Sequence, residues 1–456
     1  MPILPHDAHE ALLLNGFSAE VWMPPGVTET TVRERAGLGQ LHPGDNGGVG
    51  LVLGAGNITS IPPLDVLYEI VANNRAVVLK LNPTLAPLMS VYAAALAPLI
   101  TFGVLRIVQG GSAVGSYLAH HDGISHVHIT GSSITHDVVV FGPGAEGARR
   151  KKAGTPLLAK PMTSELGGVS PIIVVPGKWT KRDLRYQAEH VATMRLHNGG
   201  YNCIAGQVVV VSAEWPQKQA FLAELRSAID RAPARHAWYP GSQARLAAAE
   251  KTYPTAEKLG VDGCRLFIDL TSSSDASTIE HTEYFSPVLG IIEITGSGQA
   301  FLDRAVESVN RDFLGTLGAN VIVQPRDRKA LGRGFDEAIA NLKYGTIGIN
   351  AWTGLGFLTA AAPWGAFPGH TLNDVGSGIG VVHNAFLIDS PERTVVTGPF
   401  RPFPRSFAHG EWALFPKPPW FVTARSAART GELLSGYASG PSWAKMPAVF
   451  VSAFRA

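Results

Sequence analysis

Short runs of aliphatic and β-branched residues are separated by longer, helix-like stretches between residues 50 and 212. The short runs predict strands at residues 49–54, 76–80, 104–108, 125–130 and 171–175, and the stretches between them predict helices at 63–73, 86–99, 113–120 and 180–197. Because the runs are apolar almost throughout, both faces of each strand are expected to be covered. The alternation therefore predicts a doubly wound parallel sheet with crossover helices.

A second α/β unit is predicted over about residues 204–380. Its strands are expected at 207–212, 264–270, 288–294, 319–324 and 345–350, with helices at 217–232 and 328–342. The residues after 380 are rich in proline, phenylalanine and tryptophan, with one β-prone run, RTVVTGPF. We therefore predict three segments, at residues 1–202, 203–380 and 381–456.

The composition agrees with a large α/β protein. The chain has 456 residues, 45% of them apolar, which is enough for two or three domains. Its 38 Lys and Arg residues balance 36 Asp and Glu residues, and the one basic run, Arg149 to Lys152, lies in a segment rich in glycine that we interpret as a solvated loop. No nucleic acid or anionic membrane surface is expected as a partner.

One stretch, residues 87–105, has the length and apolar character of a membrane span. Pro98, Gly103 and the strand-like run that follows favour a buried helix and strand instead. The N-terminus lacks the basic and apolar regions of a signal peptide. The two cysteines, Cys203 and Cys264, are too few for a disulfide framework in a chain of this size. We expect a cytoplasmic protein with no membrane span.

Cys203 lies in the stretch NGGYNCIAGQ, between a glycine pair and a β-branched run. The glycines let the backbone approach a bound group, and the loop can direct the thiol and its own N–H into one cleft. A thiol is a nucleophile only as the thiolate, which is favoured near a helix end, a cation or N–H donors. Taken alone, this stretch also fits an inert, buried cysteine.

Five further stretches occur with this one in an order that resembles the aldehyde dehydrogenase superfamily over about residues 50–385. These are GAGN (54–57), AVVLKLNPTLAPL (76–88), HITGSS (128–133), SELGGVSP (164–171) and EYFSPVLGIIEI (283–294). The resemblance implies a Rossmann-type cofactor domain, an α/β catalytic domain and a small C-terminal oligomerisation segment. It also implies an NAD(P)-dependent enzyme that oxidises a small aldehyde to a carboxylic acid.

The resemblance assigns the chemistry to three residues. Cys203 would attack the aldehyde carbonyl, and Asn57 together with the Cys203 N–H would stabilise the resulting oxyanion. A thioester remains on Cys203 after hydride leaves for the cofactor. Glu165 would then act as the general base for the hydrolytic water.

The resemblance also assigns the cofactor contacts. Lys80 would bond the ribose hydroxyls from the carboxyl end of a parallel strand. Gly131 and Ser132 would open a helix whose N-terminal amides suit a pyrophosphate. Glu283 would hold the nicotinamide ribose, and Phe285 would pack near the ring. Because the glutamate that usually grips the ribose is replaced in Leu81-Asn82-Pro83, the choice between NAD and NADP stays open.

The chain departs from the family pattern in two respects. Tyr201 occupies a position where glutamine is usual, which is expected to reshape the substrate tunnel. The aromatic residues Tyr201, Trp352, Phe357 and Trp364 suggest an apolar tunnel, but they fit a packed core equally well. Only 56 residues precede Asn57, where the family has well over a hundred, so the N-terminus is expected to be short. A homo-dimer or a tetramer is expected, with residues 389–400 as a strand that pairs across the subunit interface.

Other functions remain open at this point. His120, His121, His126 and His128 form a histidine-rich stretch, but no acid stands at ligand spacing and no metal site is predicted. A CoA-acylating relative would transfer the acyl group to coenzyme A, although such relatives often lack the glutamate found at Glu165. A non-catalytic cofactor-binding protein and a cysteine hydrolase that needs no cofactor are the remaining alternatives.

Overall fold

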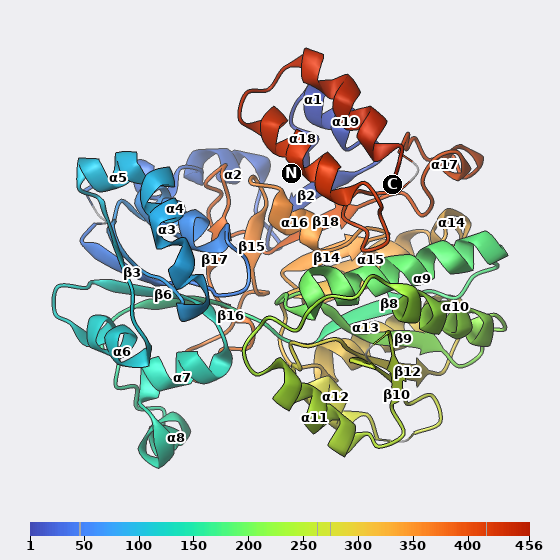
Figure 1. Ribbon diagram of the computed structural model, residues 1–456, viewed down its shortest axis with the longest axis horizontal. Coiled ribbons are helices and arrows are strands. Elements are labelled where there is room, and N and C mark those ends of the chain that lie inside the picture. Colours follow the sequence, from blue (N-terminus) through green and yellow to red (C-terminus); the bar gives the residue numbers. More distant parts are fainter. Residues whose placement is uncertain (45–46, 262, 274, 416) are drawn as a thin grey trace.

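The computed structural model describes residues 1–44, 47–261, 263–273, 275–415 and 417–456, and it contains two large β-sheets. In Figure 1 the smaller sheet, drawn in blue and cyan, lies beside the larger one, drawn in green to orange. The C-terminal helices, in red, lie above the larger sheet together with the first helix.

The smaller sheet has six strands that are parallel except at one edge. Their spatial order is β16 (Gly378–Ile379), β7 (Met162–Leu166), β6 (His126–Gly131), β3 (Val49–Leu53), β4 (Ala76–Lys80) and β5 (Leu105–Val108), with β16 antiparallel. One face is covered by α3 (Ile61–Asn73), η2 (Pro83–Leu88), α4 (Met89–Ala95) and α5 (Ala97–Phe102). The other face is covered by α6 (Ser112–His120) and α7 (Ser133–Phe141), and α8 (Gly144–Ala153) packs on α7.

Side-chain alternation separates the two cores of this sheet. On β3, Leu51 and Leu53 join the core under α6 and α7, whereas Val52 joins the core under α3 and α4. Successive strand residues point to opposite faces, so one apolar strand supplies both cores. This is the doubly wound arrangement that the sequence predicts.

The larger sheet has ten strands, of which seven are parallel. Their spatial order is β1 (Pro2–Leu4), β2 (Ser18–Trp22), β18 (Arg393–Thr397), β14 (Thr346–Ile349), β13 (Gly318–Ile322), β8 (Ser170–Val174), β9 (Gly206–Ser212), β12 (Val288–Ile294), β11 (Arg265–Asp269) and β10 (Glu257–Leu259). The strands β1, β2 and β10 pair antiparallel with their neighbours.

Helices cover both faces of the larger sheet. The core on one face includes residues of α9 (Lys181–Leu196) and α10 (Lys218–Arg231). The core on the other face includes residues of α11 (Ser242–Thr252), α12 (Ser277–His281), α13 (Gly298–Asp312) and α15 (Arg333–Asn341), with α14 (Pro325–Leu331) beside them. The mixed α/β class predicted from the sequence is confirmed.

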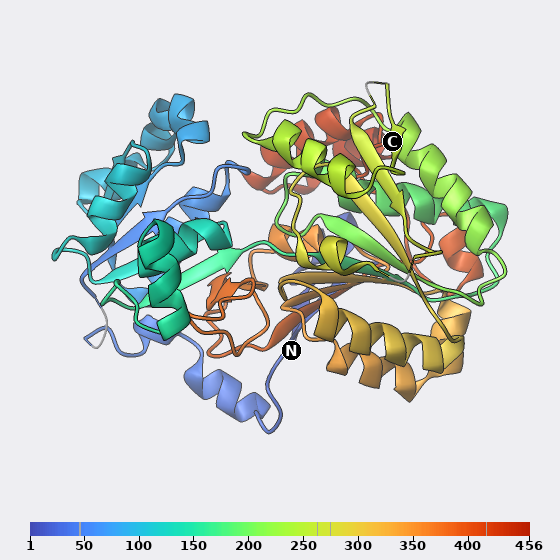
Figure 2. The same ribbon diagram turned by 90° about the horizontal axis from the view of Figure 1, so that it is seen from below.

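The chain ends and the connections between the sheets form smaller units. The terminal helices are α1 (Ala8–Leu13), α2 (Glu29–Arg35), η1 (Leu38–Gln40), α17 (Arg405–Ala408), α18 (Ala427–Ala438), η4 (Trp443–Lys445) and α19 (Met446–Ala453). The short helix α16 (Gly354–Leu358) precedes a two-stranded sheet of β15 (Pro363–Gly365) and β17 (Val381–His383). In Figure 2 this orange segment lies between the two large sheets.

The sheet topology corrects the predicted boundaries. The chain leaves the smaller sheet at the end of β7 and enters the larger one at β8. The strand β8 therefore belongs to the larger sheet, and α9 packs on that sheet, although both lie within the predicted cofactor domain at residues 1–202. The strands β1 and β2 also belong to the larger sheet. Likewise β18, expected to pair across a subunit interface, has β14 and β2 of its own chain on its two sides.

One local prediction needs correction, whereas another, helix and strand in place of a membrane span, agrees with the structure. The basic run Arg149 to Lys152 is not a loop but the last turns of α8, which begins after Pro143 and ends at the left-handed Gly154. The apolar stretch 87–105 is divided among η2, α4, α5 and β5. Within the described part of the chain, no helix combines the length and apolar character needed to cross a membrane.

Candidate active site

Cys203 lies in a sharply turned loop between α9 and β9. After α9 the chain passes through η3 (His197–Gly200), where Asn198, Gly199 and Gly200 have φ angles of 54°, 70° and 85°. This left-handed backbone is easy for glycine and reverses the chain within three residues. The turn places Cys203 just before the amino end of β9. These strand ends of the larger sheet face the smaller sheet.

Arg195 fixes this loop from inside. Its guanidinium donates to the carbonyl oxygen of Gly200 at 2.7 Å and to that of Ala205 at 3.5 Å, one on each side of Cys203. The side chain is buried, and burial lowers the arginine pKa to about 10, so it stays charged at neutral pH. The sequence analysis missed this residue; a cation in the last turn of α9, just before a glycine pair, was the available signal.

Glu165 approaches Cys203 from the smaller sheet. It stands on β7 beside Thr130 of β6 and is 4% exposed. Trp364 donates its indole N–H to Glu165 Oε1 at 3.2 Å. Burial raises the pKa of Glu165 to about 7, while the hydrogen bonds with Cys203 and Trp364 oppose the rise. A carboxyl group with this pKa can take up and release a proton near neutral pH.

The Cys203 thiol is not activated by a nearby cation, contrary to one of the modes expected from the sequence. Burial raises its pKa well above the ordinary value, and the charge of Glu165 and the hydrogen bond with it raise the pKa further. The resting sulfur is therefore a thiol rather than a thiolate. Its conversion to a thiolate requires that Glu165 accept the proton.

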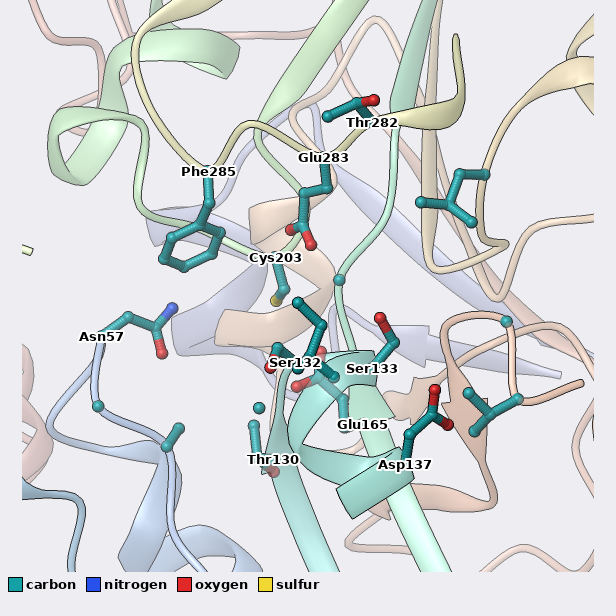
Figure 3. Close-up of a pocket in the computed structure, with 18 of the residues that line it drawn as sticks. Asn57, Thr130, Ser132, Ser133, Asp137, Glu165, Cys203, Thr282, Glu283 and Phe285 are labelled. Carbon is teal, nitrogen blue, oxygen red and sulfur yellow. The ribbon is translucent and has the colours of Figure 1, made fainter. Parts of the chain in front are cut away.

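Asn57 faces the sulfur from the opposite side, in the middle of the loop between β3 and α3. Its Nδ2 donates to the carbonyl oxygen of Tyr201 at 3.0 Å, and Asn198 Nδ2 donates to the Asn57 carbonyl oxygen at 3.1 Å. An amide nitrogen carries two hydrogens, so one N–H of Asn57 is left for an oxyanion on a group bound to Cys203. Figure 3 shows Asn57, Glu165 and Cys203 pointing toward one another.

Two cavities meet at these residues. One has a volume of about 620 Å³ and is lined by Glu165, Ser132, Glu283 and Phe285, among others. The other has a volume of about 530 Å³, and its aromatic lining consists of Trp238, Trp352, Phe357 and Trp364. Cys203 and Asn57 line both cavities.

Tyr201 is the exception among the aromatic residues expected at a substrate tunnel. Its side chain is 1% exposed and bonds Ser242 Oγ at 2.8 Å, away from the aromatic cavity. Its carbonyl oxygen accepts from Asn57, and its ring packs edge to face on Trp238, which lines the aromatic cavity. The Tyr201 ring thus contacts a wall of the cavity without lining it, whereas Trp352, Phe357 and Trp364 line it directly.

The larger cavity contains four of the five residues expected to hold a cofactor. Gly131 ends β6, and Ser132 caps α7 by accepting from the Thr135 N–H at 3.2 Å. Ser133 and Ile134, the first residues of α7, also line the cavity. The helix N-terminus thus offers backbone amides and a positive dipole end to an anionic group there. The fifth residue, Lys80, ends β4 and does not line the cavity, so its ribose contact stays a prediction.

Glu283 lies close against the chain that carries Glu165. A Cβ at Gly167 would be 2.0 Å from Glu283 Oε1, so a larger residue at position 167 would displace the Glu283 carboxylate. Burial raises the pKa of Glu283 to about 8, the nearby Arg195 opposes the rise, and the charge of Glu165 adds to it. Phe285 beyond it has a φ of 42°, a strained angle that directs its ring toward the cavity.

The histidine-rich stretch is distributed over separate surroundings. His126 and His128 are buried on β6, and His120 and His121 lie at the end of α6. Among the residues that the structure describes, no group of three or more His, Cys, Asp or Glu side chains has the arrangement of a metal site.

Comparison with known proteins identifies the architecture. The profile of the aldehyde dehydrogenase family matches residues 48–367. Among curated proteins, the N-succinylglutamate 5-semialdehyde dehydrogenase of Hahella chejuensis is 27% identical over 244 residues, which cover 49% of this chain and 45% of the relative. A betaine aldehyde dehydrogenase of Cereibacter sphaeroides is 28% identical, covering 55% of this chain and 50% of the relative. The chain thus spans about half the length of the curated relatives it matches.

Solved structures support the same fold. The gamma-glutamyl-gamma-aminobutyraldehyde dehydrogenase of Burkholderia cenocepacia superposes with a TM-score of 0.56 at 21% identity, covering 77% of this chain and 68% of that one. The Mycobacterium tuberculosis aldehyde dehydrogenase complexed with NAD+ gives a TM-score of 0.55 at 19% identity, with 77% and 68% covered. At such identities the likeness establishes the fold.

Proposed function

Because the chain belongs to the aldehyde dehydrogenase family, we propose that it is an NAD(P)-dependent enzyme that oxidises an aldehyde to a carboxylic acid. The observation that carries the proposal is the meeting of Cys203, Glu165 and Asn57 where two cavities join. A nucleophile, a base and an oxyanion donor around one point are what acyl chemistry on a thiol requires.

NAD or NADP fits the larger cavity. The amides of Ser133 and Ile134 at the α7 N-terminus would hold the pyrophosphate, and Glu283 would hold a ribose hydroxyl near Cys203. The Mycobacterium tuberculosis structure of the same fold contains NAD+. When bound, the nicotinamide supplies the hydride acceptor. The residues of this chain supply its position and exclude water from it.

Formation of the thioester begins at the thiol. Glu165 accepts the Cys203 proton, and the sulfur bonds to the aldehyde carbon. The carbonyl oxygen becomes an alkoxide that accepts from Asn57 Nδ2 and the Cys203 backbone N–H, each worth about 3 kcal/mol in acyl-transfer enzymes. When the C–H bond breaks with its electron pair, the alkoxide becomes a carbonyl and a thioester remains on Cys203.

Hydrolysis returns the enzyme to its starting state. Glu165, after losing the first proton, accepts a second one from water as the hydroxide bonds to the thioester carbon. The C–S bond then breaks, Glu165 returns its proton to the Cys203 thiolate, and the carboxylic acid leaves. The raised pKa of Glu165, about 7, suits a group that accepts and releases a proton twice in each cycle.

The second cavity favours an aldehyde with an apolar body. Trp352, Phe357 and Trp364 surround the approach to Cys203, and Ile58, Ile61 and Leu85 complete the apolar wall. Such a lining binds a hydrocarbon or aromatic group through burial of its surface. The aldehyde carbon would then point to the sulfur and the rest of the substrate to the aromatic side.

We also propose that the chain forms a homo-dimer or tetramer. The support is an exposed aromatic cluster in the C-terminal segment, in which Phe403, Phe407 and Trp412 stack edge to face. Trp412 is 75% exposed, and exposed apolar clusters mark surfaces of association. Light scattering of the wild-type protein measures the mass, and a strictly monomeric protein would contradict this part of the proposal.

A panel of aldehydes tests the activity. We expect NADH or NADPH to form with an apolar aldehyde, together with the free acid and without coenzyme A. Product formation that depends strictly on coenzyme A would replace hydrolysis by acyl transfer. A complete lack of reduced cofactor with every aldehyde, although nucleotide binds, would favour a non-catalytic protein.

A further inference from the structure

One face of the smaller sheet carries polar side chains where the opposite face carries an apolar core. On β6, Val127 and Ile129 face the core under α7, so His126, His128 and Thr130 face α3. The register of β6 and β7 places Thr163 beside His128 and Glu165 beside Thr130. We call the residues His126, His128, Thr130, Thr163 and Glu165 on the sheet, with Asp65 and Glu69 on α3, the polar stripe.

The stripe is buried along its length. Asp65 and Glu69, one turn apart on α3, are 0% and 2% exposed. His126 and His128 are 5% and 3% exposed. Burying several ionisable groups costs folding free energy, and apolar side chains of similar size would pack here at lower cost. A role in packing alone does not account for the stripe.

The inner half of the polar stripe begins at the larger cavity. Thr130 and Glu165 both line that cavity. Thr130 Oγ1 donates to Asp65 Oδ2 at 2.8 Å, and His128 Nε2 lies 3.6 Å from the same carboxylate oxygen. The other nitrogen of that ring, His128 Nδ1, lies 2.9 Å from Thr163 Oγ1. The two sides of one imidazole thus connect Asp65 with Thr163.

The outer half continues toward the surface. Thr163 Oγ1 lies 3.0 Å from His126 Nε2, and this nitrogen lies 3.9 Å from Glu69 Oε1. Arg75 donates to Glu69 Oε2 at 2.8 Å, and its side chain is 17% exposed. Polar contacts therefore follow one another from the cavity to a residue in contact with solvent.

The proposed reaction needs such a path. Aldehyde, oxidised cofactor and water give carboxylate, reduced cofactor and two protons, and Glu165 accepts a proton in each half of the cycle. A buried carboxyl must release its first proton before it can activate water. We infer that the polar stripe conducts this first proton from Glu165 to the surface beside Arg75, a role that rests on the proposed function.

Each transfer is balanced along the stripe. Glu165 protonates the Thr130 hydroxyl as that hydroxyl gives its own proton to Asp65, and Asp65 then protonates His128 Nε2. His128 releases the proton on Nδ1 to Thr163, which passes its own proton to His126, and Glu69 accepts it from there. The imidazole returns to its first tautomer when the ring turns over. No oxidant or other reactant is consumed.

The charges around His128 suit a carrier. Burial lowers its pKa, but the hydrogen bond and charge of Asp65 raise it more, so the net pKa lies above the ordinary value; the charges of Glu69 and Glu165 act in the same direction. His126 behaves differently, since burial lowers its pKa to about 4, with Arg75 and His128 adding to this against Glu69. His383 of β17 also faces Asp65. His128 therefore holds a proton more tightly than His126 does, so the transfer from His128 through Thr163 to His126 is the energetically uphill step of the path.

Two variants interrupt the stripe with little change of volume. His128→Gln removes the ring that joins Asp65 to Thr163, and Thr163→Val removes the hydroxyl between the two imidazoles while keeping the shape. His120→Gln, on α6 outside the stripe, is the matched control. We expect an unchanged first burst of NADH or NADPH in both stripe variants, because the first proton need not leave Glu165 before hydride transfer.

The steady-state kcat is expected to fall about 10- to 100-fold in the stripe variants, the range of a lost proton-transfer group. A larger solvent isotope effect and partial rescue of kcat by added imidazole should accompany the loss. Unchanged kcat and isotope effect in Thr163→Val would overturn the inference. So would an equal loss of burst and kcat that imidazole does not rescue. A wild-type protein that binds nucleotide but forms no burst would instead refute the proposed function.

Discussion

The two cavities that meet at Cys203 have different walls. The larger one is lined by charged and polar groups, including Glu165, Glu283 and the N-terminus of α7. The other has aromatic walls from Trp352, Phe357 and Trp364. We therefore expect proton transfer to take place in the larger cavity. We expect the aromatic cavity to bind the apolar part of the substrate. Variants on either side should therefore change different kinetic constants.

The largest effect is expected at the junction itself. Cys203→Ser replaces the sulfur that lines both cavities with a much weaker nucleophile, so oxidation of aldehyde should fall at least about 1,000-fold. Binding of NAD(P) should persist, because the residues proposed to hold the nucleotide lie on β6, α7 and the Glu283 loop. Activity assays and titration of nucleotide by fluorescence measure the two properties. Retained oxidation in this variant would remove Cys203 from the mechanism.

Glu165→Gln changes the larger cavity, whose lining is charged and polar, and leaves the aromatic cavity intact. The amide keeps the shape but accepts no proton, so kcat should fall about 100- to 10,000-fold. Acyl-enzyme should not accumulate on Cys203, because formation of the thiolate also requires Glu165, so the mass of the intact protein should stay unchanged. In the wild type only the carboxylate form is a base, so the rate should rise with pH through about 7 and level off above it. A rate that falls over that interval would contradict the assignment.

Residue patterns were enough to predict most of the architecture and the site. The observed strands β4 and β12 coincide with the predicted ones, and the loop glycines before Cys203 do turn the chain as expected. The strand β7 was missed, although it carries Glu165, because MTSEL has no β-branched run and two polar side chains face the cavity side. The polar residues of the candidate site stand in β7 at positions where apolar residues would have predicted a strand.

Long-range contacts account for the other errors. Whether β18 pairs within or between chains depends on where β2 lies, which no local pattern encodes. The role of Arg195 follows from two carbonyl groups that only the folded loop directs at it. The helix at Arg149 to Lys152 depends on Pro143 and Glu146 at its start and Gly154 at its end, and the glycine content of the segment concealed these signals.

Phe357→Ala tests the aromatic side. Phe357 lines that cavity and stacks edge to face on Trp364, with ring centres 5.4 Å apart. Loss of this surface should weaken binding of an apolar aldehyde by about 1–2 kcal/mol and raise its KM about tenfold. The KM for NAD(P) should stay unchanged, since the cofactor cavity does not include this residue. An equal rise in both KM values would contradict the separation of the two cavities.

The smallest effect should come from Trp364, which connects the aromatic cavity with Glu165 in the larger one. Trp364 lines the aromatic cavity with its ring, while its indole N–H reaches Glu165. This hydrogen bond lowers the pKa of Glu165 against the effect of burial, so Trp364→Phe should raise that pKa and move the rising limb of the pH–rate profile upward by less than about one unit.

Trp352→Phe is the matched control. It changes the same cavity, but within the described residues its indole nitrogen has no hydrogen-bond partner, so the profile should stay in place. Equal shifts in the two variants would show that the shape of the aromatic cavity sets the pKa of Glu165. A shift in Trp364→Phe alone would show that the indole N–H of Trp364 lowers the pKa of Glu165.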